Sequence, residues 1–218
     1  MKRLIAWGVG VSILFSASAL LFPRARVGYL ASSLVSVHHQ EQVEAVVQLG
    51  ILGPEASAAV PALLELTRDP NPNPPDTRGE SLWALGRIAP ESPEVRIRAR
   101  DLLARDSNDW VRGNAATVLL SGDIRLVEKD VPLLLSTLLR EQKVAPPRDY
   151  AAFHSLSYGL AHLARKDPTV RPAIQAALEE GFRIPEQNVR ITSGAGLWEL
   201  DPVRARALGV EEPVLPVE

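Results

Sequence analysis

Residues 111–119 read VRGNAATVL, a stretch that places a small residue, Ala115, four positions before a leucine, Leu119. The two positions lie on one face of a helix, because side chains three and four residues apart are neighbours at 3.6 residues per turn. A small residue lets a second helix approach closely, and the leucine fills the groove one turn further on. The stretch therefore predicts the first helix of a packed helical hairpin.

The same arrangement occurs five times along the chain. The leucine anchors lie 36, 34, 44 and 34 residues apart, and each has a small residue four positions before it. The pairs are Leu49 with Ala45, Leu85 with Ser81, Leu119 with Ala115, Leu163 with Gly159, and Leu197 with Ser193. A period of this length is typical of a solenoid built from helical hairpins.

A second helix is predicted after each anchor, because a proline follows four of the five anchors at the same distance. These prolines are Pro54, Pro90, Pro168 and Pro202. Proline is favoured at the first position of a helix, where its missing N–H would be unpaired in any case. We expect the second helices to begin at these prolines, or near Pro93 in the second hairpin, with Asp123, Asp167 and Asp201 as N-caps.

On these residues the chain resembles the HEAT repeats, and among them the short HEAT-like repeats of bilin lyase subunits. The resemblance covers residues 40–208 and rests on two kinds of segment, one in the first helices and one in the second. The segments are Val111-Arg112-x-x-Ala115-Ala116-x-x-Leu119, its echo Val189-Arg190-x-x-Ser193-Gly194-x-x-Leu197, Val60-Pro61-Ala62-Leu63-Leu64 and Val131-Pro132-Leu133-Leu134-Leu135.

The resemblance implies an all-α fold, a short right-handed α-α superhelix of the armadillo type with about five helical hairpins. It also implies a protein-protein interaction scaffold or adaptor, with an unidentified protein as partner. The alternative that it leaves open is an accessory or catalytic subunit of an enzyme of the bilin-lyase type. Repeats of this kind serve many functions, so the fold alone does not choose between the two.

The first 26 residues form a separate segment with two interpretations. Lys2 and Arg3 precede an apolar run over residues 4–22, which is long enough as a helix to cross a hydrocarbon core of about 30 Å. The same run fits a cleaved signal peptide, with Ala17-Ser18-Ala19 as a cleavage site. Both interpretations place the repeats outside the cytoplasm, either anchored in the inner membrane or, after cleavage, periplasmic or secreted.

Three segments therefore divide the chain. Residues 1–26 are expected to form a signal peptide or membrane anchor helix, residues 27–210 the HEAT-like repeat domain, and residues 211–218 an extended C-terminal tail. The chain has no cysteine, so the repeats must be stabilised by burial and not by disulfides.

Composition and motifs argue against several functional classes. A net charge of −2 and an aromatic content of 5% give no basic groove and no stacking platform for nucleic acid. His154 and His162 share one face of a predicted helix, but a metal site would need further ligands. The sequence nominates no catalytic, metal-binding or cofactor-binding residue, and we expect a protein that is not an enzyme and needs no cofactor.

Two sets of residues have both a structural and a partner-binding interpretation. Trp83, Trp110 and Trp198 lie beside apolar anchor positions, which favours packing between repeats over a role as binding hot spots.

Arg96 and Arg100 are the candidate partner-binding residues, because a like-charged pair at this spacing is unfavourable within an isolated helix. Second helices line the concave face of HEAT-like stacks, where the pair would meet an acidic partner. The structural alternative is pairing with Glu65 or Asp130 of the neighbouring hairpins.

Overall fold

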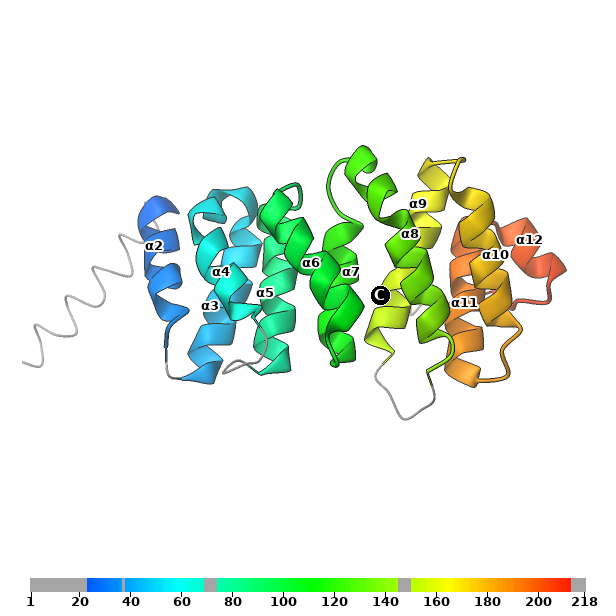
Figure 1. The fold of residues 1–218 in the computed structure, drawn as a ribbon, viewed down its shortest axis with the longest axis horizontal. Helices are drawn as coiled ribbons and strands as arrows, with labels where there is room; N and C mark the ends of the chain where they lie inside the picture. Colours follow the sequence, from blue (N-terminus) through cyan, green and yellow to red (C-terminus); the bar gives the residue numbers. More distant parts are fainter. Residues whose placement is uncertain (1–22, 37, 69–73, 145–149, 213–218) are drawn as a thin grey trace, which may run out of the picture.

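The chain folds into a row of antiparallel helical hairpins, and the computed structural model describes it over residues 23–36, 38–68, 74–144 and 150–212. The first helices of the hairpins are α3 (His39–Leu52), α5 (Pro75–Ile88), α7 (Asp109–Leu119), α9 (Ala151–Lys166) and α11 (Gln187–Leu200). The second helices are α4 (Val60–Leu66), preceded by the 3-10 helix η1 (Gly53–Ala59), α6 (Pro93–Arg105), α8 (Ile124–Glu141), α10 (Arg171–Phe182) and α12 (Pro202–Ala207). No strand occurs in the described ranges, and the predicted all-α solenoid of five hairpins is confirmed (Figure 1).

The predicted anchors form the core of the row. All five anchor leucines are buried, with exposed fractions of 5% for Leu163 and 0% for the others. The small residues four positions earlier are buried as well, except Gly159, which is half-buried and receives the side chain of Leu120 from α7. The spacing of small residues and leucines therefore identified the faces that pack.

The second helices begin as predicted in the second, third and fifth hairpins, whereas in the first hairpin Pro54 lies at the start of the 3-10 helix η1 and α4 begins only at Val60. The fourth hairpin differs as well. Asp123 and Asp201 cap α8 and α12, each accepting a hydrogen bond from a backbone N–H of the first turn. Asp167 instead accepts hydrogen bonds from the backbone N and the hydroxyl of Thr169, at 2.8 and 2.7 Å. These bonds close a turn over residues 168–170, so α10 begins at Arg171 and the predicted start at Pro168 is wrong.

One helix precedes the five hairpins. Helix α2 (Pro23–Ser33) packs on α3 and η1 and buries Val27, and the side chain of Arg26 donates a hydrogen bond of 3.0 Å to Gln48. We predicted the repeat domain from residue 27, and within the described residues helix α2 extends the packed part of the chain back to Pro23. The apolar run over residues 4–22 lies outside the described residues.

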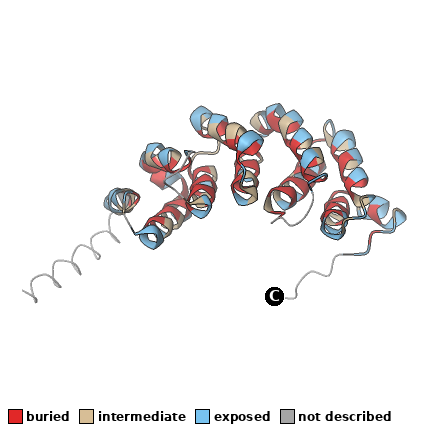
Figure 2. Ribbon diagram, turned by 60° about the horizontal axis from the view of Figure 1, so that its bottom comes forward, coloured by how far each residue is buried: buried red, intermediate tan, exposed pale blue. Residues whose placement is uncertain are grey.

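The two layers of helices differ in how tightly they pack. Each first helix packs directly along the next one in the row, whereas the second helices touch one another much less. A row that is closer on one side curves toward that side, and Figure 2 shows an arch whose inner side is formed by the first helices. Our expectation that the second helices line the concave face is therefore wrong, because glycines and other small residues bring the first helices closer together.

One described segment has the length and apolar composition of a membrane span. It is the helical stretch His39–Leu66, with a mean hydropathy of 1.3. The stretch is the first hairpin of the solenoid: Gly53, with φ of +58°, separates α3 from the rest, and Leu49 and Leu63 are completely buried in the core. Part of its apolar surface is thus buried by packing within the repeat row.

Candidate interaction surface

The inner face of the arch consists of first-helix side chains that point away from the second helices. A helix turns by about 100° per residue, so positions two, five and nine before a buried anchor, and two after it, lie opposite that anchor. Side chains of this kind are the large residues Ile51, Trp83, Arg87, Trp110, His154 and Tyr158. All of them except Trp83 are exposed, with fractions of 57% for Ile51, 40% for Trp110 and 46% for Tyr158.

Trp83 joins the first two hairpins. Its ring occupies the space that a side chain at Gly50 of α3 would fill. The Nε of Arg87 donates a hydrogen bond of 3.0 Å to the carbonyl of Gly50, and its guanidinium lies 5.3 Å from the centre of the Trp83 ring. The predicted packing between repeats is confirmed for this tryptophan.

Trp110 repeats the arrangement one hairpin later. Its ring lies on Gly79 of α5, again where a Cβ would overlap it, and its backbone carbonyl accepts a hydrogen bond of 3.0 Å from Asn114. The ring therefore packs between repeats, as predicted, while two fifths of the residue stays accessible. Trp198 is half-buried, with Arg206 of α12 5.3 Å from its ring centre.

Helix α9 contributes a stripe of three exposed residues at four-residue spacing, His154, Tyr158 and His162. The shared face predicted for the two histidines is therefore an exposed one, and Tyr158 stands between them. None of the three side chains makes a hydrogen bond or ion pair within the described ranges. No three His, Asp or Glu residues in that part of the chain lie close enough together to hold a metal ion.

Arg96, one of the two predicted partner-binding residues, lies in the interior with an exposed fraction of 2%. Its guanidinium forms an ion pair with Asp130 of α8 and donates hydrogen bonds of 2.9 to 3.2 Å to backbone carbonyls around it. These carbonyls belong to Pro90, Leu119, Ser121 and Leu126.

Arg100 pairs with the other oxygen of Asp130, and 38% of its side chain remains exposed. Of the two interpretations given for this pair, the structure shows the structural one: both arginines pair with Asp130. The partner-binding hypothesis does not fit Arg96, because its guanidinium is buried and paired with Asp130 inside the protein. The like charges at this spacing are tolerated because a single buried carboxylate lies between them.

Other arginines join the helices of one hairpin or of two neighbouring hairpins. Arg78 binds Asp106 across 3.0 Å, with both side chains buried, and Arg112 of the quoted stretch binds Glu141 of α8 across 3.2 Å. At the C-terminal end, hydrogen bonds from Arg204 and Gln175 lower the pKa of Glu179 to about 2, which ties α12 to α10. The arginines of the row are thus largely structural.

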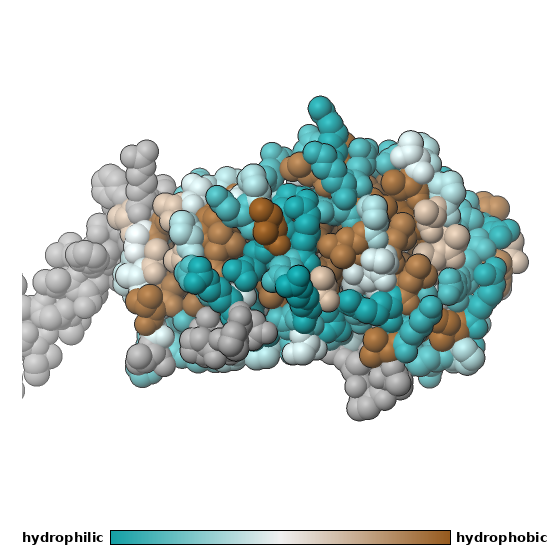
Figure 3. All heavy atoms as spheres, viewed as in Figure 1, coloured by the Kyte–Doolittle hydropathy of each residue, from teal (hydrophilic) through white to brown (hydrophobic). Residues whose placement is uncertain are grey.

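The outer face offers a different surface. Figure 3 views the second helices, and hydrophilic side chains gather over α6. That helix exposes Glu94, Arg105 and, among them, Ile97 with an exposed fraction of 62%. The charges partly pair with each other, as in the 3.1 Å bridge between Asp101 and Arg105. This face is a solvated one and carries no exposed aromatic ring on α6.

Comparisons with known proteins give one family match and two similar structures. The family model of HEAT repeats matches residues 33–120. A crystal structure of an engineered protein from the Northeast Structural Genomics Consortium is similar with a TM-score of 0.53 and 17% identity, over 84% of this chain and 85% of that chain. A designed armadillo repeat protein is similar at 16% identity with a TM-score of 0.35, over 79% of this chain and 99% of that chain. No curated protein sequence matches the chain.

These findings define the class of protein. The predicted resemblance to HEAT repeats is confirmed for residues 33–120, and the likeness to the engineered structure supports a repeat solenoid over most of the chain. Such a solenoid typically serves as a scaffold for protein interactions.

Proposed function

We propose that the protein is a non-catalytic interaction scaffold, held at the cell envelope, that binds a partner polypeptide on the inner face of its arch. The observation that carries the proposal is the group of accessible aromatic and imidazole side chains on the inner face of α7 and α9, Trp110, His154 and Tyr158, with the exposed His162 beside them. Tryptophan and tyrosine bury a large area at a small cost in side-chain entropy, and they are enriched in the energetic centres of protein interfaces.

A rigid support strengthens this interpretation. Trp110 is held on Gly79, and α9 packs along α7 through the backbone of Ala151 against Gly113. Side chains that are already positioned lose less conformational freedom when a partner binds, so more of the contact energy appears as affinity. The mechanism is presentation of a preformed curved surface, without a chemical step.

The test is a pair of matched variants of the full chain. Replacing both His154 and Tyr158 with alanine is expected to weaken partner binding by about tenfold or more, since centrally placed aromatic contacts cost over 1 kcal/mol when removed. A photo-crosslinking amino acid at position 158 first captures and identifies the partner from solubilised membranes, and its affinity for each variant is then measured with the purified partner.

The control is Ile97→Ala, which removes a side chain of similar exposure from the outer face. We expect this variant to bind as the wild type does, and both variants to keep the wild-type circular-dichroism spectrum. Equal loss of binding in the two variants, or none in either, refutes the inner face as the binding surface.

The cellular location is proposed from the sequence alone, through Lys2, Arg3 and the apolar run that follows. Alkaline phosphatase fused after Leu208 is expected to be active in intact cells, because this enzyme requires an oxidising compartment for its disulfides. A fluorescent reporter that works only in the cytoplasm should be dark at the same position. The reverse pattern contradicts export, and mass spectrometry of the N-terminus then separates the anchor from a signal peptide cleaved before Leu20.

A further inference from the structure

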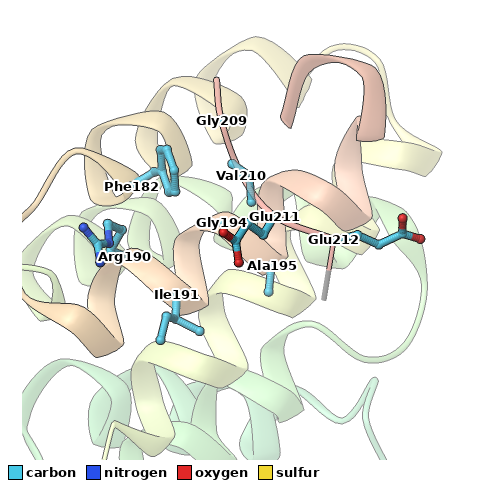
Figure 4. Close-up of a pocket in the computed structure, with 9 residues that line it drawn as sticks. All are labelled: Phe182, Arg190, Ile191, Gly194, Ala195, Gly209, Val210, Glu211 and Glu212. Atoms are coloured by element: carbon cyan, nitrogen blue, oxygen red, sulfur yellow. The ribbon is translucent and has the colours of Figure 1, made fainter. Parts of the chain in front are cut away.

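A groove of about 530 Å³ lies at the C-terminal end of the row, between α10, α11 and the segment that follows α12. Its walls are apolar in the middle and charged at the margins (Figure 4). The lining residues are Phe182, Arg190, Ile191, Gly194, Ala195, Gly209, Val210, Glu211 and Glu212.

The groove lies where no further hairpin follows α12 in the described residues. Inside the row, the small residues of one first helix are covered by the next, as Gly113 is by Ala151. At α11 no further first helix follows in the described residues, and Gly194 is covered instead by Val210 and Phe182, with 3.0 and 3.3 Å between their side chains and the position of an added Cβ. Ile191, one turn earlier on the same helix, remains 57% exposed. The floor of the groove is therefore a helix face on which no further hairpin packs within the described residues.

The charges at its margins have no side-chain partners among the described residues. Arg190, Glu211 and Glu212 are exposed, and none of them takes part in an ion pair or side-chain hydrogen bond within the described ranges. Figure 4 shows Arg190 beside Phe182, with the Glu211 carboxylate on the other side of the apolar floor. Many arginines of this protein form ion pairs within or between hairpins, as Arg78 and Arg204 do, so a separated cation and anion across an apolar floor are distinctive.

We propose that this groove binds an extended segment of the partner polypeptide that carries an acidic side chain toward Arg190, a basic side chain toward Glu211 and Glu212, and apolar side chains between them. Charge complementarity sets this pattern, because like charges at either end would be repelled. The inference rests on the proposed scaffold function and names the chemistry of the partner at the edge of the inner face. Residues 213–218 of the chain itself, PVLPVE, contain an acidic residue but no basic one, so they match half of the pattern.

The experiment measures fluorescence anisotropy of three labelled peptides with blocked ends against the purified full chain. The peptides share an apolar centre of valine and leucine and carry one acidic and one basic end, two acidic ends, or two basic ends. We expect the mixed peptide to bind the wild type most tightly, by about fivefold over the other two, as suits one favourable charge pair near the surface.

Charge-reversal variants test which charges of the groove set the peptide preference. Arg190→Glu makes both ends of the groove acidic, so it is expected to weaken the mixed peptide about fivefold and to shift the preference to the peptide with two basic ends. Replacing Glu211 and Glu212 with lysine should shift it to the peptide with two acidic ends. Arg125→Glu is the control, because Arg125 is an exposed arginine on α8 far from the groove along the chain, and it should change none of the three affinities.

Several results overturn the inference. Equal affinity for the three peptides, no binding, or an unchanged preference in Arg190→Glu each contradicts it. Binding that appears only after deletion of residues 213–218 makes the chain's own tail the occupant and also contradicts it. If the peptide measurements contradict the groove in this way, but the double variant at His154 and Tyr158 still binds the partner more weakly, the scaffold function stands without this site.

Discussion

Replacing Arg96 with alanine is expected to lower the free energy of unfolding by about 3–5 kcal/mol, the range found when one partner of a buried ion pair is removed. The guanidinium is 2% exposed, and it satisfies Asp130, which is equally buried, together with four backbone carbonyls. Alanine leaves that carboxylate without its fully buried partner and leaves the carbonyls short of a donor. Urea unfolding followed by circular dichroism measures the change.

Two arginines on the same helix provide the comparison. Arg105→Ala is expected to change the free energy of unfolding by less than about 1 kcal/mol, because its bridge to Asp101 lies at the surface and 82% of the Arg105 side chain is exposed. Arg100→Ala should fall between the two, since it shares Asp130 but is 38% exposed. A loss for Arg96→Ala no larger than that for Arg105→Ala would contradict a structural role.

The sequence identified Arg96 as unusual but did not decide its role. A like-charged pair on one helix and a carboxylate in the next hairpin, Asp130, were both visible in the chain. The burial of Arg96 was not visible in the sequence. It depends on carbonyls from the end of α7 and the start of α8, which meet around the same guanidinium. An interaction that involves three helices, here α6, α7 and α8, cannot be recognised from the residue spacing within any one of them.

The helical row itself was predictable for a simple reason. Whether Leu85 or Leu119 is buried depends on the period of its own helix, and a fixed period of small residue and leucine recurs five times. The start of α10 was missed because Asp167 bonds to Thr169 and makes a turn where a helix was expected. A turn closed by a side-chain hydrogen bond of this kind competes with an N-cap, because Asp and Thr are favoured in both.

The inner face was assigned to the wrong layer for a different reason. Curvature depends on which layer packs more tightly, and this is set by glycines on the sides of the first helices that face the next hairpin. Gly50 and Gly86 directly follow their anchors, whereas Gly79 and Gly113 lie six residues before theirs. Each of them receives a residue of the following hairpin. This regularity is readable in the sequence and would have placed Trp83, Trp110 and Tyr158 on the concave side.

Gly113→Val is expected to destabilise the fold by about 3 kcal/mol, at the upper end of the cost of overpacking a tight contact. A Cβ at this position would lie 3.0 Å from the backbone carbon and oxygen of Ala151 and 3.1 Å from the nitrogen of Ala152. Backbone atoms in the first turn of α9 cannot rotate aside as a side chain can, so α7 and α9 must move apart. The loss is measured as the shift in the urea midpoint at constant slope.

Gly28→Val on α2 is the matched control, since nothing lies within 4 Å of a Cβ at that position. We expect it to change stability by less than about 0.5 kcal/mol, because valine and glycine differ little in helix propensity. The two variants also separate packing from binding. Moving α9 away from α7 displaces His154 and Tyr158 from Trp110, so Gly113→Val should weaken partner binding under conditions where the protein is still folded, while Gly28→Val should leave it unchanged. Equal stability of the two variants would show that the close approach of α7 and α9 does not set the curvature of the inner face.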